Sequence, residues 1–549
     1  MNKATFPANP IVGRRQRRGW RDLAYGSAPY QWLLGRRPPY QLLFTPPDLW
    51  PGDSARGYAV LAAGTIFTPD RAEPHDLPPG IEPHGFAWLR DLRANGTEAA
   101  RRRGRELIRD WIVNFGRYDS VAWRPDLVAE RIVQWLTQYD YFVRTADNGF
   151  RDLYFASIDR QAEHLFRVVR RTEPGAMRLA ASKGLIYAGL CLPEGEVRYV
   201  RGIELFDGEL QQRVFADGFV RERSPTRQAD LLRHTLDVRA TLAAAHRPMP
   251  VLVQNAIDRG APALRTVLHP DGGLALFNGG DEIDAAAIAR LLTLADEPGA
   301  AAAPFSGGFH RLNAGPTTLI ADLAAPATES LSTGAHAGTL SFEMSVGRTR
   351  VIVNCGAFGG AHPRWREMSR TTAAHSTLTL ADTNSSEILP TGPLGDGVRS
   401  VAAKRSDQGG DLWLEAEHDG YVQRFGLAHR RRLFLSSGGD DLRGEDALLR
   451  VNQGRRTAES FAVRFHLHPD ISVDLEDGPR NRPAAAKLSL PDGSIWSFRA
   501  VGDALTALDA SIYLGAPGAP RACRQLVLTG VPGPRDDAAV VKWAFKREL

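Results

Sequence analysis

The sequence has 549 residues, which at about 150 residues per domain indicates two or three domains. Its net charge of +5 is carried by arginine more than lysine, and arginine binds carboxylate, sulfate and phosphate oxygens bidentately. The three cysteines, Cys191, Cys355 and Cys523, are too far apart to predict a disulfide framework or a zinc ribbon. An acidic ligand explains the arginine excess, and so does the codon preference of a GC-rich genome. No recognition module accompanies the basic charge, so a nucleic-acid partner is not predicted.

Residues 1–85 read as a basic, Pro-rich arm. The arginine pairs at 14–15 and 17–18 lack the apolar run of a secretory or twin-arginine signal, and no membrane span is predicted. The aromatic residues that follow, from Trp20 to Trp32, suit either peripheral contact with an anionic membrane or docking of the arm onto its own domain. Proline density disfavours long helices here, and residues 59–67 are predicted to form a short hairpin.

From residue 86 to about 300 the apolar residues recur three and four positions apart, which is typical of amphipathic helices. Short polar or Gly/Pro links between helices of similar length predict an antiparallel bundle or a toroid of helical hairpins. Ser224 followed by Pro225 marks one helix start. The predicted helices cover residues 97–115, 125–144, 153–172, 175–191, 202–216, 224–246, 248–258 and 284–296.

From residue 301 to 549 the period changes to two, and Gly, Asp and Asn turns separate short apolar runs. Strands without intervening helices favour an antiparallel β-sandwich over a parallel sheet. The predicted strands are 317–325, 340–346, 350–354, 376–381, 412–416, 431–436, 461–467, 486–490, 495–500 and 526–529. The expected architecture is therefore a helical domain at 86–300 followed by a β-sandwich domain at 301–549.

One stretch, Gly334 to Asp382, concentrates the residues capable of chemistry. His336 and His375 flank a predicted strand that ends in an Asn-Cys-Gly turn at 354–356, and a basic, aromatic loop with Arg370 near its end lies between them. Any functional interpretation has to include this stretch.

The motifs of this stretch resemble those of the bacterial heparinase II/III-like family. AHAGTLSFEMS, VIVNCG and RTTAAHSTL stand in the family's order, where its members have HxHADALSFEL, VDPG and RSTAAHNTL. Upstream, DGFVRERSPTRQADLLRHTLDV resembles the segment with the ERSPxYH motif. The resemblance implies polysaccharide lyases built from an incomplete α/α toroid and an antiparallel β-sandwich, with the site in the cleft between them, in agreement with the change of period.

The resemblance also implies a reaction, the β-elimination of uronic-acid glycans. A group neutralises the uronate carboxylate, a base removes the C5 proton and an acid protonates the leaving O4. In this sequence Arg227 stands at the family's Tyr, Gln228 at the next His and Gly334 at the first His of HxHAD. Arginine remains charged and is a poor acid or base, so the best-known proton-transfer set is absent.

The family's metal-binding His, Asp and His correspond to His336, Asn354 and His375. An Asn carbonyl in place of a carboxylate removes a charge that would attract a divalent ion. A zinc or calcium ion at this triad is one expectation. The other is a metal-free cluster in which hydrogen bonds satisfy the three side chains.

The remaining candidates divide into proton-transfer groups and ligand contacts. His310, at a Gly-rich turn before the first strands, joins His336 and His375 as a candidate catalytic residue, with a structural role as the alternative. Arg227, its neighbour Gln228 and Arg370 are candidate substrate contacts, because neutralising a carboxylate needs charge and not a titrating group.

These observations lead to two hypotheses of different classes. The first is a polysaccharide lyase for an acidic glycan, with a modified catalytic set. The second is a non-catalytic glycan-binding or envelope-associated protein that kept the fold. The compartment is open, since the sequence shows no export signal and the family resemblance implies the periplasm.

Overall fold

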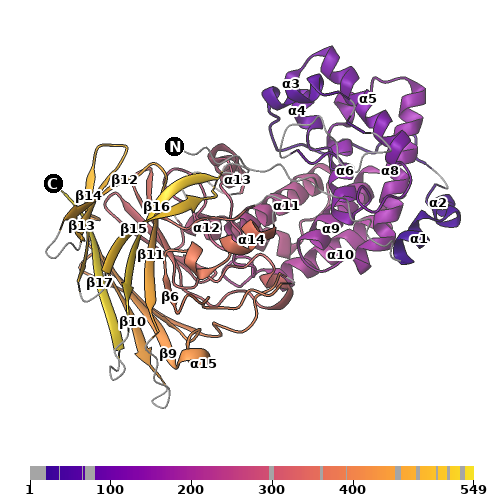
Figure 1. The fold of residues 1–549 in the computed structure, drawn as a ribbon. Coiled ribbons are helices and arrows are strands. Elements are labelled where there is room, and N and C mark those ends of the chain that lie inside the picture. Colours follow the sequence, from indigo (N-terminus) through magenta and orange to yellow (C-terminus); the bar gives the residue numbers. More distant parts are fainter. Residues whose placement is uncertain are drawn as a thin grey trace. The chain divides into compact units, whose positions relative to one another are not determined.

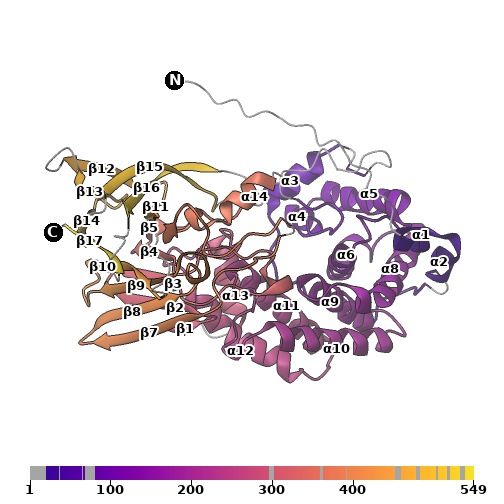
Figure 2. The same ribbon diagram turned by 60° about the horizontal axis from the view of Figure 1, so that its bottom comes forward.

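The structure is a computed structural model, which describes residues 20–35, 38–64, 66–67, 81–295, 302–358, 363–390, 392–451, 459–477, 483–501, 505–515, 520–531 and 538–548. Helices precede strands along the chain, as Figures 1 and 2 show. The chain divides into two compact units. Unit 1 is Met1–Phe206 with Ala244–His246, and unit 2 is Asp207–Ala243 with Arg247–Leu549. The predicted order of a helical region and then antiparallel sheets is confirmed.

Unit 1 is helical, and its apolar helix faces enclose a core rich in tryptophan. Trp111, Trp123 and Trp135 are all buried in it. Helix starts follow capping rules, since Thr97 and Asp147 each accept a backbone N–H three residues ahead. The helices are α1 (Trp20–Gly26), α2 (Ala28–Leu33), α3 (Ser54–Ala62), α4 (Leu89–Asn95), α5 (Glu98–Phe115), α6 (Pro125–Thr137), α7 (Tyr139–Phe142), α8 (Asn148–Val168), α9 (Ala176–Cys191) and α10 (Glu196–Arg213), the last of which runs across the division between the units.

One prediction for the N-terminal arm is wrong, because α3 occupies the region predicted as a hairpin. Asp53 caps this helix by accepting the backbone N–H groups of Ala55 and Arg56. Gly57 brings α3 against the backbone carbonyl of Asp91, which a Cβ atom would meet at 2.2 Å. Tertiary packing and a good cap thus override a sequence context that suggested strands.

Within unit 1, helices α1 and α2 pack against His164 of α8 through two tyrosines. The Tyr30 hydroxyl lies 2.8 Å from His164 Nδ1, and Tyr25 packs edge-on against the same imidazole. The side chains of Trp20 and Trp32 remain largely exposed, at 71% and 67%. Among the described residues, no helix combines the length and apolarity that a bilayer crossing requires.

Unit 2 holds two antiparallel sheets and the helices α11 (Pro225–Ala244), α12 (Val251–Thr266) and α13 (Ala285–Ala295). The first sheet has the order β1-β2-β3-β4-β5-β11-β16-β15, with β6 paired to β11, and the second has the order β12-β13-β14-β17-β10-β9-β8-β7. The strands are β1 (Phe305–Ser306), β2 (Phe309–Ala314), β3 (Thr317–Asp322), β4 (Phe342–Val346), β5 (Thr349–Val353), β6 (Leu378–Leu380), β7 (Val401–Gln408), β8 (Asp411–His418), β9 (Leu427–Leu435), β10 (Asp441–Arg450), β11 (Phe461–Leu467), β12 (Ser472–Asp477), β13 (Pro483–Ser489), β14 (Ile495–Val501), β15 (Leu505–Tyr513), β16 (Arg521–Gly530) and β17 (Ala538–Arg547).

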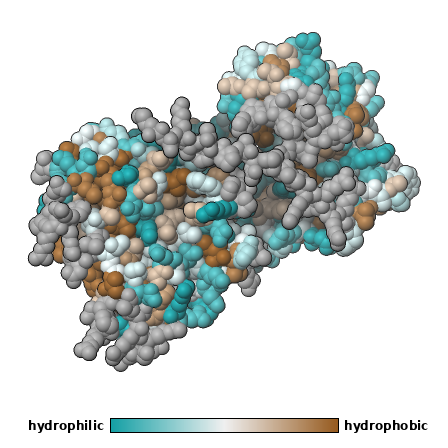
Figure 3. Space-filling model, viewed as in Figure 1, coloured by the Kyte–Doolittle hydropathy of each residue, from teal (hydrophilic) through white to brown (hydrophobic). Residues whose placement is uncertain are grey.

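The two sheets share one apolar core, to which both contribute their inward-facing side chains. Phe342 of β4 stacks on Trp543 of β17, with ring centroids 5.7 Å apart and planes at 2°. Residues of β8 and β9 alternate between buried and more exposed positions, as expected when one face of a sheet covers a core. On the face of the molecule in Figure 3, small apolar patches lie among hydrophilic ones. The sandwich prediction is therefore confirmed.

A charged cluster lies buried inside this core. The Asp446 carboxylate of β10 accepts bonds from Arg431, His429 and the Trp543 indole N–H, at 2.7 to 3.0 Å. Arg431 also donates to the backbone carbonyls of Leu340 and Ser376, which belong to the stretch that bears the two histidines. This cluster ties the second sheet to the candidate site.

Candidate functional site

His336 and His375 contact one another directly, so the structure brings together the two histidines that bracket the motif stretch. His336 Nδ1 lies 3.1 Å from His375 Nε2, and both rings are buried. The 3₁₀ turn Thr372–Ala374 precedes His375 and places its Nδ1 2.7 Å from the carbonyl of Thr371. The backbone N–H of Gly279 donates to His336 Nε2 at 3.1 Å.

These partners assign the proton positions of both rings. His375 Nδ1 faces a carbonyl and must be the protonated nitrogen, so its Nε2 accepts. His336 Nε2 accepts from an N–H group, so its Nδ1 carries the proton and donates to His375. Burial holds the pKa of His336 well below its ordinary value, and so do the neighbouring His375 imidazole and the Arg370 charge; burial also lowers the pKa of His375. The pair is therefore neutral, and all four ring nitrogens are used.

This arrangement does not fit the predicted metal site. An ion on His336 Nδ1 would move the ring proton to Nε2, where it would face the N–H of Gly279. Asn354 also has its amide engaged, since its oxygen accepts from Ser376 N–H and its nitrogen donates to Glu343. In the part of the chain that the structure describes, no three His, Cys, Asp or Glu side chains are placed to hold a metal ion.

A second polar cluster beside Asn354 was not predicted from the sequence. Glu343 of β4 is fully buried, and its carboxylate accepts from the backbone N–H groups of Asn354 and Leu276 and lies 2.9 Å from His269 Nε2. The Ser345 hydroxyl lies 2.7 Å from His269 Nδ1. Ser345, His269 and Glu343 are hydrogen-bonded in the order of a Ser-His-acid relay. All three side chains are buried, so a substrate cannot reach them. Their hydrogen bonds instead hold the 268–276 turn against β4. In the sequence, Glu343 and Ser345 alternate with apolar residues within a strand. This spacing could have indicated that the two polar side chains lie on the same face of the sheet.

Gln228 does not lie where a substrate could contact it, contrary to the prediction. Its amide is fully buried and donates to the carbonyls of Gly218 and Gly260, both at 3.0 Å. Its oxygen accepts from the backbone N–H of Val220 at 2.8 Å. Gln228 therefore fastens the first turn of α11 to the 218–220 loop and to α12, and these bonds use both its amide nitrogen and its amide oxygen.

Arg227, one residue earlier, points to solvent. Its side chain is 53% exposed and pairs with Asp230 at 3.1 Å, one turn along α11. Such an exposed pair contributes little to stability, so the guanidinium can exchange Asp230 for an anionic ligand. Thr226, at the same helix start, accepts the backbone N–H of Asp281 in the loop that also supplies Gly279.

Arg370 is buried beside the histidine pair. Its guanidinium donates to the carbonyl of Ala335 at 2.8 Å and to that of Ser332 at 3.3 Å. Among the described residues, no carboxylate lies within ion-pair distance of it. Burial and the nearby Arg366 charge lower its pKa. Arg370 therefore shapes the Gly334–Ala337 segment and keeps an unneutralised charge there.

His310 lies on β2, and in the described part of the chain none of its contacts is with His336 or His375. Its ring stacks on Phe305 with centroids 5.7 Å apart. Burial and the Arg405 charge lower the pKa of His310 to about 4. The structure thus groups two of the three predicted catalytic histidines and leaves the third on its own.

Gly334, at the position of the family's first histidine, is unobstructed. A Cβ atom built at Gly334 would meet no atom within 4 Å. The backbone of Gly334 lies beside Gly279, where a Cβ atom would be 3.0 Å from the Gly334 carbonyl oxygen. The backbone thus has room for a side chain at the place where this chain has none.

Comparisons with known proteins agree with this geometry. Two family models cover most of the chain, "Heparinase II/III N-terminus" at residues 90–296 and "Heparinase II/III-like, C-terminal" at residues 297–544. FtsZ-localized protein C of Caulobacter vibrioides (strain NA1000 / CB15N) is 34% identical over 481 residues, covering 82% of this chain and 82% of that protein.

Solved structures show the same fold at low sequence identity. A crystal structure of heparinase III matches with a TM-score of 0.70 and 14% identity, over 91% of this chain and 86% of that one. The heparan sulfate lyase HepC of Pedobacter heparinus matches with a TM-score of 0.61 and 17% identity, over 91% and 84%. The chondroitin AC lyase of Streptomyces coelicolor A3 matches with 0.54 and 14%, over 95% and 80%.

Proposed function

Because the chain belongs to the heparinase II/III-like family, we propose that it keeps the lyase fold without the elimination reaction and localises with FtsZ. One observation carries the first half of this proposal: the positions of the family's proton-transferring Tyr and first His hold Arg227 and Gly334, and the His after the Tyr is replaced by Gln228. The similarity to FtsZ-localized protein C over most of both chains supports the second half.

The chemistry of elimination explains why these positions matter. A base must reach the C5 proton of the sugar, and an acid must reach the leaving oxygen. An arginine stays protonated at neutral pH, a glycine has no side chain, and the amide of Gln228 is buried and hydrogen-bonded. His336 and His375 offer no substitute, because they are buried and their nitrogens bond to each other and to the backbone.

The association with FtsZ can be tested by co-sedimentation. The purified full chain is expected to pellet with assembled FtsZ and to stay in the supernatant with unassembled FtsZ. Heparinase III, which shares the fold at low identity, is the matched control and is expected to stay in the supernatant. Equal recovery of the two proteins in the pellet would contradict the proposal.

The competing proposal is elimination on an acidic glycan by a modified catalytic set. It is favoured by two cations, since Arg227 is exposed and Arg370 has no carboxylate partner among the described residues. In that case Arg227 and Arg370 would neutralise a uronate, and an unsaturated product absorbing in the ultraviolet would form. If only recognition is retained, Arg227→Ala is expected to weaken binding of an acidic polysaccharide without any product forming.

We also predict that the exposed tryptophans of α1 and α2 contact an anionic membrane peripherally. Trp20, Leu23 and Trp32 are exposed, and basic residues precede them in the sequence. Binding to vesicles rich in phosphatidylglycerol is expected to weaken on the order of tenfold in a Trp20→Ser, Trp32→Ser variant, because apolar area that inserts at the interface is lost. Tyr58→Ser, which removes an exposed aromatic ring from α3, serves as the control. Equal losses in both variants would refute a specific contact.

A further inference from the structure

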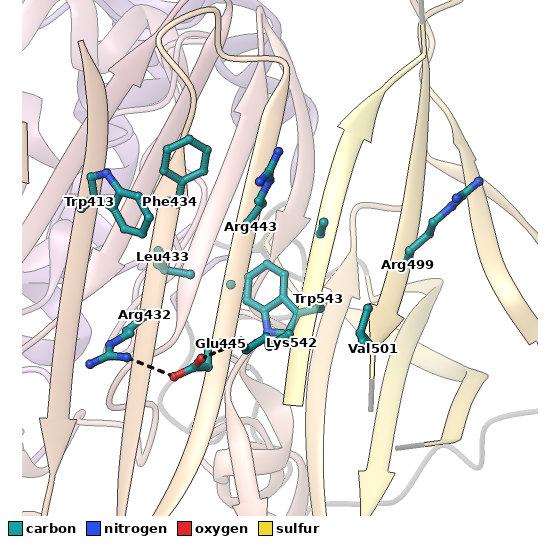
Figure 4. A pocket seen from close by; sticks show the side chains of 12 residues that line it. Trp413, Arg432, Leu433, Phe434, Arg443, Glu445, Arg499, Val501, Lys542 and Trp543 are labelled. Carbon is teal, nitrogen blue, oxygen red and sulfur yellow. Dashed lines mark hydrogen bonds and ion pairs between the residues drawn. The ribbon is translucent and has the colours of Figure 1, made fainter. Parts of the chain in front are cut away.

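The outer face of the eight-stranded sheet carries a hollow of about 500 Å³ that the candidate site does not use. It spans the five strands β8, β9, β10, β17 and β14 (Figure 4). The aromatic rings of Trp413 and Phe434 lie at one side and Arg499 at the other, with Arg443 between them.

Strand register places these side chains in one row across the sheet. Trp413 pairs with Phe434, Phe434 with Arg443, Arg443 with Ala544, and Ala544 with Arg499. Because cross-strand partners point to the same side, the row presents two aromatic rings, a cation, a methyl group and a second cation in that order. The rings of Trp413 and Phe434 have centroids 4.6 Å apart, and the Arg443 guanidinium lies 5.5 Å from the Phe434 ring.

One small residue gives the hollow its depth, and a glycine beside it shapes the core under the sheet. Ala544 leaves space between Arg443 and Arg499 in the row. Gly444, next to Arg443, lies over the Trp543 indole, and a Cβ atom there would be 2.1 Å from that ring. Only glycine fits at position 444, so the floor of the hollow is part of the core packing.

The charges around the hollow are unequal. In the neighbouring row the charges balance, since Glu415 pairs with Arg432, and Glu445 lies 3.4 Å from Arg432 and 3.8 Å from Lys542. In the aromatic row, Arg443 pairs with Asp441 but is 64% exposed. No carboxylate lies within ion-pair distance of Arg499 in the part of the chain that the structure describes. Of the four lining cations, three have carboxylate partners, and Arg499 has none among the described residues. The excess positive charge is therefore concentrated at Arg499 and at the exposed Arg443, which favours an anionic ligand there.

We infer that this hollow binds an acidic oligosaccharide, with a sugar ring on the Trp413 and Phe434 platform and acidic groups on Arg443 and Arg499. Exposed aromatic faces suit the C–H groups of a sugar ring, and guanidinium groups suit carboxylate and sulfate oxygens. With strands about 4.8 Å apart, the backbone positions of the two arginines are roughly 10 Å apart, a span of about two sugar rings.

An acidic peptide fits the same surface less well. Extended peptides gain affinity by adding a strand to a free sheet edge. The five strands under the hollow all lie inside the sheet, with β7 and β12 as its edges, so their backbone groups are already paired. Recognition here has to come from side chains alone. The inference depends neither on association with FtsZ nor on catalysis.

Calorimetric titration of the full chain with size-matched oligosaccharides tests the inference. Heparan sulfate, chondroitin sulfate and oligouronate fragments serve as acidic probes, dextran as the neutral probe and oligoglutamate as the acidic peptide. At least one acidic saccharide is expected to bind, and a Trp413→Ala, Arg499→Ala variant to bind it at least about tenfold more weakly. Lys404→Ala, an exposed cation on the edge strand β7 of the same sheet, is expected to change affinity less than about twofold.

Several results would overturn the inference: no binding of any acidic saccharide, equal binding of dextran, or equal or tighter binding of oligoglutamate. Binding that survives in the Trp413→Ala, Arg499→Ala variant and falls in Arg227→Ala would place the glycan at the candidate site instead. Because both changes of the double variant are at exposed side chains, a matching thermal midpoint is expected to show that the fold is intact.

Discussion

Replacing Asp446 by alanine is expected to lower the free energy of unfolding of unit 2 by about 3–5 kcal/mol, because it leaves the Arg431 charge buried without its partner. Both side chains are almost fully buried, at 1% exposure each. Burial alone would raise the pKa of Asp446, but the Arg431 charge and the bonds from His429 and Arg431 hold it well below its usual range. The carboxylate is thus charged and organises three donors.

The neighbouring residue provides the control for this experiment. Glu445 points to the outer face and forms three long ion pairs, with Arg430, Arg432 and Lys542 at 3.4 to 3.8 Å. Glu445→Ala is therefore expected to cost at most about 1 kcal/mol. Urea denaturation measures the free energy of unfolding of both variants. Similar decreases for Asp446→Ala and Glu445→Ala would show that the buried cluster does not hold the sheets together.

Replacing Arg223 by alanine is expected to destabilise unit 2 by a similar amount, about 3–5 kcal/mol. Arg223 is buried at the start of α11, and its guanidinium donates to the Asp322 carboxylate and to the carbonyls of Gly307, Ala324 and Ala325. Its backbone has φ 52°, a left-handed conformation that these bonds maintain. Its own carbonyl accepts from Asn278, which in turn accepts from His336 N–H.

Arg227, four residues further on, is the matched control for Arg223. It is exposed and forms an ion pair with Asp230, so Arg227→Ala is expected to change stability by less than about 0.5 kcal/mol. Loss of the Arg223 contacts is also expected to disorder the Gly279 and His336 contact, observable as a shift in the imidazole resonances of His336. A stable Arg223→Ala variant with unchanged resonances would contradict this role.

Much of the fold could be predicted because the period of apolar residues is a direct consequence of burial. The helices at 98–115, 176–191 and 225–244 agree with the predicted ones to within two residues at each end, and the predicted strand 461–467 has the observed bounds. Seven strands were not predicted, namely β1, β2, β7, β10, β12, β15 and β17. In β7, β10 and β17, charged side chains on the outer faces hide the alternation. The helix α3 was missed because flanking prolines suggested irregular structure and its cap went unrecognised.

The candidate site could be predicted only in part. The motifs correctly placed His336 and His375 together, since both flank strands of one sheet. Sequence could not show that Gln228 faces inward, because helical spacing leaves its orientation to tertiary contacts. It also could not assign the protons of the histidine pair, which depend on one backbone N–H from a distant turn and one local carbonyl. Those two contacts are what make the predicted metal site a poor fit.

We propose that the protein keeps the lyase fold without the elimination reaction. An ultraviolet absorbance assay tests this proposal most directly. The full chain is incubated with a broad panel of uronic-acid glycans, with heparinase III as the positive control. We expect no rise in absorbance from this chain on any glycan of the panel, while the control produces unsaturated uronate. A rise that is abolished in both Arg227→Ala and Arg370→Gln variants would contradict the account and establish a lyase with a modified catalytic set.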